Sequence, residues 1–218
     1  LEVCFVKCYP SIPLWNDCRR RFGELCCVFR KYDGSNLRFS WSPKRGWYKF
    51  GTRTRLFDKT DPVFGPAIDL FAWSFGEGIE KRLIDSGIYK RPESIVAFCE
   101  FFGPHSFAGQ HDPAFLKVEA NDPKRLVLLD VGVYKQGFVP PGQFRKIFAG
   151  TMPVAEEITR LPFTEQFCRD VWEGHLTDGE GVIVKGGQGH DIWMAKVKTK
   201  AYMERLEAVF GINWKKYW

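Results

Sequence analysis

Short apolar runs rich in β-branched and aromatic residues recur along this chain, and they narrow its possible folds more than any other feature. Each run has the length of a strand and is bounded by turn-forming residues. Strands are therefore predicted at residues 25–29, 37–41, 47–50, 95–102, 126–134, 181–185 and 193–198. The second and third runs flank SPKRG (residues 42–46), whose early Pro and late Gly favour a tight turn. Hairpins of this kind predict antiparallel sheets.

Apolar residues at helical spacing are less frequent. They predict helices at residues 75–86, 163–172 and 201–210. Gly87 and Gly211 would cap the first and the third of these helices. Helices inserted between hairpins indicate an α+β domain of two antiparallel sheets flanked by helices. Because the sequence shows no internal repeat and no linker, a single domain is expected over residues 1–218, with a short helical tail from about residue 199.

The composition is typical of a globular cytosolic protein. Hydrophobic residues make up 44% of the 218 and aromatic residues 16%, which is enough for a substantial core. No apolar run approaches the length of a membrane span, so no membrane partner is expected. The seven cysteines form no C-x-x-C pair, which indicates reduced thiols and a cytoplasmic location. The first residue is Leu1 rather than Met, which suggests a start inside a longer reading frame.

Basic residues exceed acidic residues, 32 against 26, which gives a net charge of +6. They are clustered at residues 19–21, 44–45, 53–55 and 215–216. A solvated face is the ordinary explanation of any single cluster, but the combination suits a polyanionic partner such as nucleic acid.

The segment KYDGSN (residues 31–36) places a lysine where a predicted buried strand ends and a hairpin begins. The strand would hold the backbone of Lys31 while its side chain projects into a cleft, and Gly34 permits a sharp turn or the close approach of a ligand. A lysine with an ordinary pKa of about 10.4 is a poor nucleophile. Burial or neighbouring cations would depress that pKa and release the lone pair. Taken alone, the segment fits a plain surface turn equally well, because Asp-Gly is a common turn pair.

Four later segments carry polar residues within predicted strands. They are FCEFFG (98–103), LLDV (128–131), GEGVIVK (179–185) and WMAKVK (193–198). Glu100 lies between apolar residues, where a carboxylate is rarely buried without a partner. Lys196 and Lys198 alternate on a strand, so both face one side, and on the cleft side they would clamp a phosphate and depress the pKa of Lys31. An exposed strand explains the lysine pair equally well.

In this order the five segments resemble motifs I, III, IIIa, IV and V of the covalent nucleotidyltransferases, which comprise DNA ligases, RNA ligases and mRNA-capping guanylyltransferases. The resemblance extends from about residue 5 to about residue 200. The opening FVKCYPSI (residues 5–12) is similar to RNA ligases of the bacteriophage T4 RNA ligase 2 type. The chain ends about twenty residues after Lys198, so the OB-fold domain of DNA ligases and capping enzymes is not expected. Two features depart from that type: Leu129 replaces the adenine-stacking aromatic, and DGSN (33–36) is closer to DNA ligases.

The resemblance implies an ATP-grasp-like adenylyltransferase domain and an ATP-dependent RNA ligase activity. Lys31 would form lysyl-AMP with ATP, AMP would pass to a 5′-phosphate end, and a 3′-hydroxyl would seal the phosphodiester. Lys196 and Lys198 would be catalytic together with Lys31, Glu100 would bind the ribose hydroxyls, and Glu180 would hold Mg²⁺ or Mn²⁺. The nucleotide-binding residues implied are Lys31, Asp33, Gly34, Arg53, Arg55, Glu100, Leu129, Glu180, Lys185, Lys196 and Lys198.

The expected partners are RNA ends, in a nicked duplex or an RNA/DNA hybrid, bound by a monomeric enzyme of RNA repair in a phage or host cytosol. A capping-type guanylyltransferase and a DNA ligase share the motifs and remain alternatives. A non-catalytic nucleic-acid-binding module that retains the fold is an alternative of another class. The intact set of Lys31, Glu100, Glu180, Lys196 and Lys198 argues against such a module.

Overall fold

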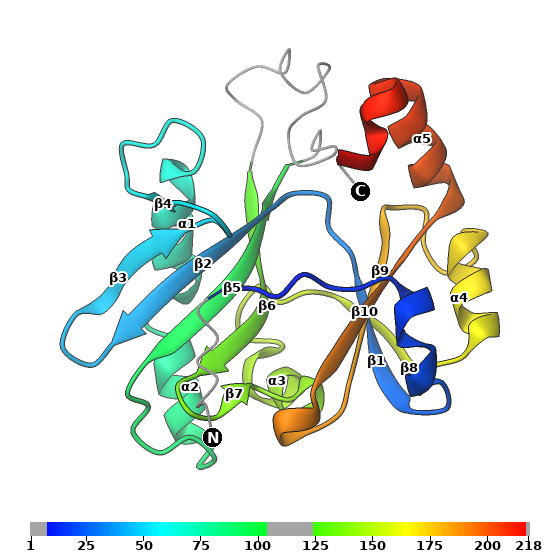
Figure 1. Cartoon of the computed structure of the whole chain (residues 1–218). Coiled ribbons are helices and arrows are strands. Elements are labelled where there is room, and N and C mark those ends of the chain that lie inside the picture. The colour runs from blue at the N-terminus through cyan, green and yellow to red at the C-terminus, as the bar shows by residue number, and fades with distance from the viewer. Residues whose placement is uncertain (1–7, 104–123, 217–218) are drawn as a thin grey trace.

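Two antiparallel sheets form the frame of the computed structural model, which describes residues 8–103 and 124–216 (Figure 1). The smaller sheet has the strand order β10-β9-β1-β8. Its strands are β1 (Leu25–Arg30), β8 (Glu157–Pro162), β9 (Gly181–Gly186) and β10 (Trp193–Lys198). The larger sheet has the order β4-β3-β2-β5-β6-β7. Its strands are β2 (Ser35–Ser42), β3 (Gly46–Gly51), β4 (Leu56–Phe57), β5 (Ile95–Phe102), β6 (Arg125–Val133) and β7 (Gly137–Phe138).

Helices cover the outer faces of both sheets, so each sheet has its own apolar core (Figure 1). The larger sheet packs against α1 (Gly65–Phe75), α2 (Ile79–Asp85) and α3 (Pro141–Phe148). The smaller sheet packs against α4 (Glu165–Trp172) and the 3-10 helix η1 (Trp15–Arg21). After β10 the chain continues through α5 (Lys200–Phe210) and the 3-10 helix η5 (Gly211–Lys216), and a short 3-10 turn, η4 (Gly189–Asp191), precedes β10.

The predicted strands and the α+β class are confirmed, whereas the helix predicted at residues 75–86 is confirmed only over residues 79–85. Phe75 ends α1, and α2 begins only at Ile79. Gly76 and Gly78 lie between them, and glycine weakens a helix interior because it loses the most conformational freedom on folding.

Two helices, α1 and α3, were not predicted from the sequence. Both begin with a Gly–Pro or Pro–Gly pair, which resembles a turn but is also compatible with a first helical turn. The helices predicted near 163–172 and 201–210 are confirmed with small shifts. Thr164 accepts a hydrogen bond from Phe167 N at 3.1 Å as the N-cap of α4, and Gly211 ends α5 with a φ of 52°.

The sheets meet through two small apolar clusters, and the chain crosses directly from one sheet to the other. One cluster contains Cys27, Phe29 and Ala155 with Leu129 packed against it, and the other is built around Tyr9 and other buried side chains. Strand β1 ends at Arg30 in the smaller sheet and β2 begins at Ser35 in the larger. The crossing residues 31–34 therefore lie between the sheets, above their common apolar floor.

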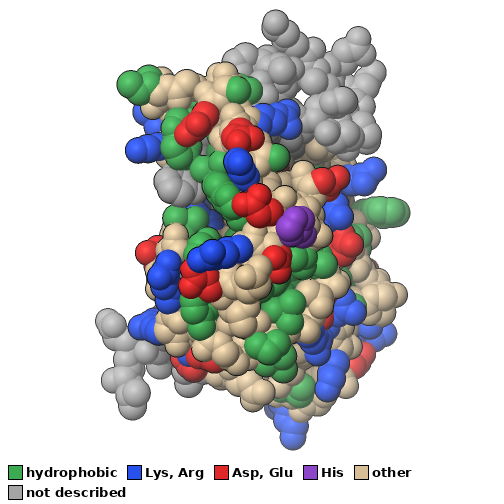
Figure 2. All heavy atoms as spheres, turned by 90° about the vertical axis from the view of Figure 1, so that its right-hand side faces the viewer, with side chains coloured by type: hydrophobic (Ala, Val, Ile, Leu, Met, Phe, Trp, Pro, Cys, Tyr) green, Lys and Arg blue, Asp and Glu red, His purple; other side chains and the backbone are tan. Residues whose placement is uncertain are grey.

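The surface on the side of α4 and α5 mixes Lys and Arg with Asp and Glu side chains (Figure 2). The basic surplus of the sequence is therefore not gathered there into a field of one sign. Among the described residues, no helix is long and apolar enough to cross a membrane. Residues 5–7 of the resemblance segment 5–12 lie outside the described residues.

Candidate active site

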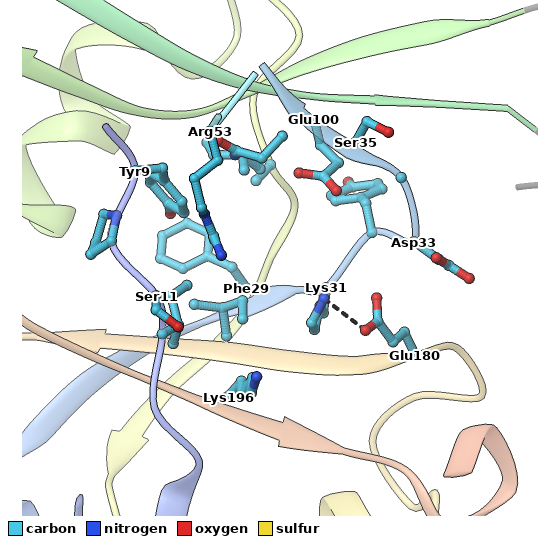
Figure 3. Close-up of a pocket in the computed structure, with 18 of the residues that line it drawn as sticks. Tyr9, Ser11, Phe29, Lys31, Asp33, Ser35, Arg53, Glu100, Glu180 and Lys196 are labelled. Atoms are coloured by element: carbon cyan, nitrogen blue, oxygen red, sulfur yellow. Dashed lines mark ion pairs between the residues drawn. The ribbon is translucent and has the colours of Figure 1, made fainter. Parts of the chain in front are cut away.

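A pocket of about 790 Å³ opens between the two sheets, and every nucleotide-binding residue implied by the motif resemblance lines it (Figure 3). The crossing segment 31–34 forms part of its wall. Glu100, at the end of β5, comes from the larger sheet, and Glu180, just before β9, comes from the smaller. Segments more than 160 residues apart in sequence, such as those of Lys31 and Lys196, therefore share one cavity.

The backbone of Lys31 is fixed by the neighbouring strand. Its amide donates a hydrogen bond to the carbonyl of Gly181 at 3.0 Å, directly after β1 ends. Gly181 has a φ of 143°, and a Cβ there would lie 2.1 Å from the carbonyl oxygen of Val197. Only glycine fits at this position, so β9 and β10 come close enough for Lys31 and Lys198 to share one partner.

That shared partner is Glu180. Its Oε1 lies 2.7 Å from Lys31 Nζ and 3.2 Å from Lys198 Nζ. The side chains of Glu180 and Lys198 are only 5% and 4% exposed, whereas that of Lys31 is 21% exposed. The carbonyl of Glu180 accepts a hydrogen bond from Thr199 N at 3.1 Å, which holds this carboxylate in place. Glu180 and Lys198 are therefore buried, whereas the amine of Lys31 is accessible from the pocket.

The pKa of Lys31 is raised in the structure, contrary to the depression predicted from neighbouring cations. Burial acts to lower this pKa, but the carboxylates of Glu180, Glu100 and Asp33 together outweigh burial. The predicted depression rested on the lysines of β10, whereas the carboxylates that face Lys31 act in the opposite direction. Without a bound ligand, Lys31 is therefore held as an ammonium group.

The pKa values of the two lysines on β10 are lowered. Burial is the first cause for both Lys196 and Lys198, and repulsion by the Lys31 ammonium adds to it. Glu180 acts in the opposite direction on both. Figure 3 shows the Lys196 side chain directed into the pocket below Lys31. Lys196 and Lys198 are therefore incompletely neutralised by the protein, and a bound anion such as a phosphate would be stabilised by them.

Glu100 lies on β5 beside Asn36 of β2, on the side of the pocket formed by the larger sheet. Burial raises the pKa of Glu100 to about 8; Lys31 opposes this shift, and Glu180 adds to it. The Nδ2 of Asn36 is buried without a hydrogen-bond partner within bonding distance among the described residues, yet it lies near enough to Glu100 to favour its carboxylate. An unsatisfied buried donor next to a buried carboxyl is suited to a ligand with hydroxyl groups.

Gly34 lines the pocket and is also in close contact with β5. A Cβ at this position would lie 2.5 Å from the carbonyl oxygen of Phe101 and 2.8 Å from Phe102 Cβ. The glycine therefore allows the crossing segment to pack directly on β5. This packing places Asp33 and Lys31 beside Glu100.

The two arginines predicted to contact the nucleotide differ in their partners. Arg53 extends into the pocket between Tyr9 and Glu100 (Figure 3). Arg55 also lines the pocket, but its Nη1 lies 2.5 Å from Oδ2 of Asp61. Of the pair, Arg53 is the residue with a guanidinium group available to a ligand.

Lys185, predicted as a phosphate contact, lines the pocket and also has partners within the protein. Its Nζ lies 2.6 Å from Asp130 Oδ2 and donates to the carbonyl of Leu129 at 2.8 Å. Both charged side chains of the pair are 4% exposed. Tyr9 donates its hydroxyl to the same Asp130 carboxylate, and burial together with Asp130 raises the pKa of Tyr9 well above its ordinary value. The pair joins β6 to β9 beneath the pocket.

Leu129 lies in the pocket wall as predicted, and it packs against both apolar clusters at the floor. Pocket residues that the sequence did not predict include Tyr9, Asn36, Tyr202 and Lys216. Asn36 could have been found as a polar residue opposite Glu100 in the predicted hairpin. Tyr9 lies in the segment 5–12, which was singled out only by its resemblance, and Lys216 lies in the basic cluster 215–216. Tyr202 lies in a predicted helix, whose pattern does not indicate a pocket residue.

The acidic residues fit a divalent ion only when it also binds a ligand. The described residues contain no group of three or more His, Cys, Asp or Glu side chains that could hold a metal by themselves. Glu180 is nevertheless a buried carboxylate at the pocket, and Mg²⁺ is commonly held by one or two carboxylates and substrate phosphates. The donor set therefore suits a cation that binds together with a phosphate.

No protein-family model matches this chain, and no curated protein matches it in sequence. Solved structures match it in fold. The RNA ligase of Naegleria gruberi has a TM-score of 0.61 at 12% identity, covering 94% of this chain and 58% of that one. An archaeal ATP-dependent RNA ligase has a TM-score of 0.61 at 16% identity, with coverages of 95% and 52%. A putative ATP-dependent DNA ligase from Aquifex aeolicus has a TM-score of 0.59 at 19% identity, with coverages of 92% and 52%.

These matches confirm the fold expected from the motif resemblance. The two sheets and their helices share the fold of part of these RNA and DNA ligase structures. The chain spans between 52% and 58% of the length of the three matched chains.

Proposed function

We propose that this chain is the nucleotidyltransferase domain of an ATP-dependent polynucleotide ligase that acts on RNA ends. The observation that carries the proposal is the position of Lys31, which lies at the mouth of the pocket, 2.7 Å from Glu180, with Lys196 and Lys198 on the adjacent strand. A nucleophilic amine, phosphate-binding cations and a buried carboxylate in one cavity are the groups that adenylation of a lysine requires.

In the first step, Lys31 Nζ loses its proton to solvent through the open pocket and attacks the α-phosphorus of ATP. A P–N bond forms, the bond from that phosphorus to the bridging oxygen breaks, and pyrophosphate leaves. Lys196 and Lys198 hold the α-phosphate in line and offset its charge. Their lowered pKa values favour a negatively charged partner.

For Lys31 to lose its proton, the stabilisation of its ammonium group by Glu180 has to weaken. Lys198 Nζ, 3.2 Å from Glu180 Oε1, can keep the Glu180 carboxylate paired when Lys31 becomes neutral. A Mg²⁺ or Mn²⁺ ion, when bound, would be held by Glu180 with phosphate oxygens and would neutralise phosphate charge.

Glu100 and Asn36 would bind the ribose hydroxyls. Glu100 carries a pKa of about 8, and a hydrogen bond from a hydroxyl would favour its ionised form. The Asn36 amide would gain the acceptor it lacks. Leu129 would lie against the base as an aliphatic surface, and Arg53 would contact phosphate.

The later steps and the RNA substrate rest on the structural neighbours. The Naegleria gruberi RNA ligase has been solved with pyrophosphate and, as mutants, with AMP and Mn and with ATP and Mn. We propose that AMP passes from Lys31 to a 5′-phosphate end, and that a 3′-hydroxyl then attacks this end and releases AMP. The similarity to the Aquifex aeolicus protein supports a DNA ligase as the second candidate.

The finer assignment follows the motif resemblance. We propose a ligase of the bacteriophage T4 RNA ligase 2 type, consisting over residues 1–218 of one nucleotidyltransferase domain with a short helical tail. A monomer in a phage or host cytosol, engaged in RNA repair on a nicked duplex or hybrid, completes the proposal.

Two assays test the proposal. The protein is incubated with Mg²⁺ and with ATP or GTP labelled at the α-phosphate, then denatured and separated by electrophoresis. Lys31→Ala is the control. Retention of the ATP label by the native protein alone is expected; retention of the GTP label would instead identify a guanylyltransferase. Ligation of matched nicked and single-stranded RNA, DNA and hybrid ends then identifies the substrate. Sealing of DNA ends alone would replace the RNA assignment with the DNA ligase.

A further inference from the structure

The cations that line the pocket divide into those with and without an acidic partner. The cations with an acidic partner are Lys31 and Lys198, which share Glu180, together with Lys185 (Asp130), Arg55 (Asp61) and Arg30 (Glu156). Across residues 8–103 and 124–216, the pocket cations without an ion-pair partner are Arg53, Lys196 and Lys216. Arg53 and Lys196 belong to the predicted site, whereas Lys216 does not.

Lys216 reaches the pocket from the end of η5. This segment is held by a separate apolar cluster formed by Tyr202, Met203 and Leu206 of α5, with Phe210 and Trp214 packed against it. Tyr202 also lines the pocket, and Lys198 Nζ lies 4.9 Å from the centre of its ring. The cluster therefore ties the position of η5 to the strand that carries Lys196 and Lys198.

The location of α5 and η5 places this lysine on the outer side of the site. Strand β10 ends at Lys198 and leads directly into α5, which lies at the same end of the molecule as the upper end of β5 (Figure 1). Lys31, Glu100 and Glu180 lie at these strand ends, so Lys216 lines the pocket near its mouth. With the ribose at Glu100 and the α-phosphorus at Lys31, as proposed above, the remaining phosphates of a nucleotide would extend toward the exposed side of the pocket.

We propose that Lys216 binds the β- and γ-phosphates of ATP and the pyrophosphate that leaves. This inference rests on the proposed function. A triphosphate carries more negative charge than Lys196 and Arg53 can offset, and an exposed, flexible ammonium group suits the outer phosphates as a point charge. Lys216 would therefore increase the affinity for ATP before adenylation and for pyrophosphate in the reverse reaction.

Lys215 is the matched control. It is the adjacent residue, is also exposed, and has the same side chain, but it does not line the pocket. Its Nζ lies 5.7 Å from the centre of the Trp214 ring. A general effect of charge at the end of the chain would appear in both variants, whereas binding of the outer phosphates would appear only at Lys216.

The test compares the full chain with its variants Lys216→Ala, Lys216→Arg and Lys215→Ala. It measures the KM for ATP, the pyrophosphate concentration that releases AMP, and the rate of sealing of a preadenylated strand. For Lys216→Ala we expect the KM for ATP in lysyl-AMP formation to rise roughly tenfold. The pyrophosphate concentration needed to release AMP from the adenylated protein should rise by a similar factor. Lys216→Arg should restore most of both, and Lys215→Ala should leave both unchanged. Sealing of a preadenylated strand, which uses no triphosphate, should be unaffected.

Two results would overturn this assignment while the native protein still adenylates Lys31. One is an unchanged KM for ATP in Lys216→Ala. The other is slower sealing of the preadenylated strand, which would place Lys216 against the nucleic acid instead. A native protein that forms no adduct would contradict the proposed function itself, so the two failures are distinguishable. Thermal unfolding of each variant establishes that the segment remains folded.

Discussion

Lys31 and Glu180 form an ion pair of 2.7 Å at the mouth of the pocket, and this pair holds the proposed nucleophile in its protonated state. Glu180, which is proposed to hold the metal ion during the reaction, therefore also keeps Lys31 protonated while no ligand is bound. Lys198 contacts the same oxygen at 3.2 Å and provides an alternative partner for that charge.

Replacing Glu180 should lower the pKa of Lys31. In Glu180→Gln the opposing charge is removed while burial and Lys198 remain, so the neutral amine is favoured. The pKa is measured by NMR titration of ¹³C-methylated lysines, with the Lys31 signal identified by its loss in Lys31→Met. Glu156→Gln is the control, because Glu156 pairs with the adjacent Arg30 at 2.9 Å on the surface. An equal pKa in native and Glu180→Gln protein would show that this ion pair does not set it.

The Glu100 carboxyl should make stability fall as pH rises. Its pKa is raised from 4.5 to about 8 in the folded chain, so its protonated form is favoured by folding. The contribution is fully present below about pH 4.5 and is lost as pH rises through 8. Relative to Glu100→Gln, the native free energy of unfolding should therefore decrease between these values and then level off.

Urea unfolding at a series of pH values measures this difference. Glu93→Gln is the control, because Glu93 is exposed and pairs with Lys135 at 3.3 Å. Parallel stability curves for native and Glu100→Gln protein would contradict the raised pKa.

Arg53 and Arg55 should respond differently to truncation. Arg53→Ala removes a guanidinium group that faces the pocket, and we expect the KM for ATP to rise about tenfold. Arg55→Ala removes a half-exposed pair with Asp61, and we expect a loss of at most about 1 kcal/mol in unfolding free energy with the KM unchanged. Kinetics of lysyl-AMP formation and urea unfolding separate the two effects. A higher KM for ATP in Arg55→Ala together with an unchanged KM in Arg53→Ala would assign the phosphate contact to Arg55.

The buried pair of Lys185 and Asp130 should matter for stability and not for ATP affinity. Lys185→Met leaves the carboxylate of Asp130 buried without its cation, at an expected cost of about 3–5 kcal/mol in unfolding free energy. The double variant Lys185→Met with Asp130→Leu should recover much of that loss, because no uncompensated charge remains. A loss of ATP affinity in Lys185→Met at unchanged stability would restore the phosphate role predicted from the sequence.

Short apolar runs in the sequence predict the strands, whereas the convergence of the motifs in one site was implied by the family resemblance. Lys31 follows an apolar run that has to be buried, and Lys196 and Lys198 are two residues apart on another, so their common orientation follows from strand geometry. The helix α1 was missed because its Gly65–Pro66 start resembles a turn.

Pairings between distant residues were beyond reach of the sequence. Nothing near Lys185 in the sequence indicates that Asp130 would neutralise it. Of the carboxylates that raise the pKa of Lys31, Glu100 and Glu180 lie 69 and 149 positions away. The direction of a pKa shift depends on which charges the fold brings within a few ångströms, and residue patterns do not carry that information.

Intact-mass analysis with peptide mapping tests the central claim most directly. The protein is mixed with ATP and Mg²⁺, and Lys31→Arg is treated in the same way. The account predicts an increase equal to one AMP in the native protein, located on Lys31 and absent from the variant. No adduct, or an adduct on a different side chain, would contradict it.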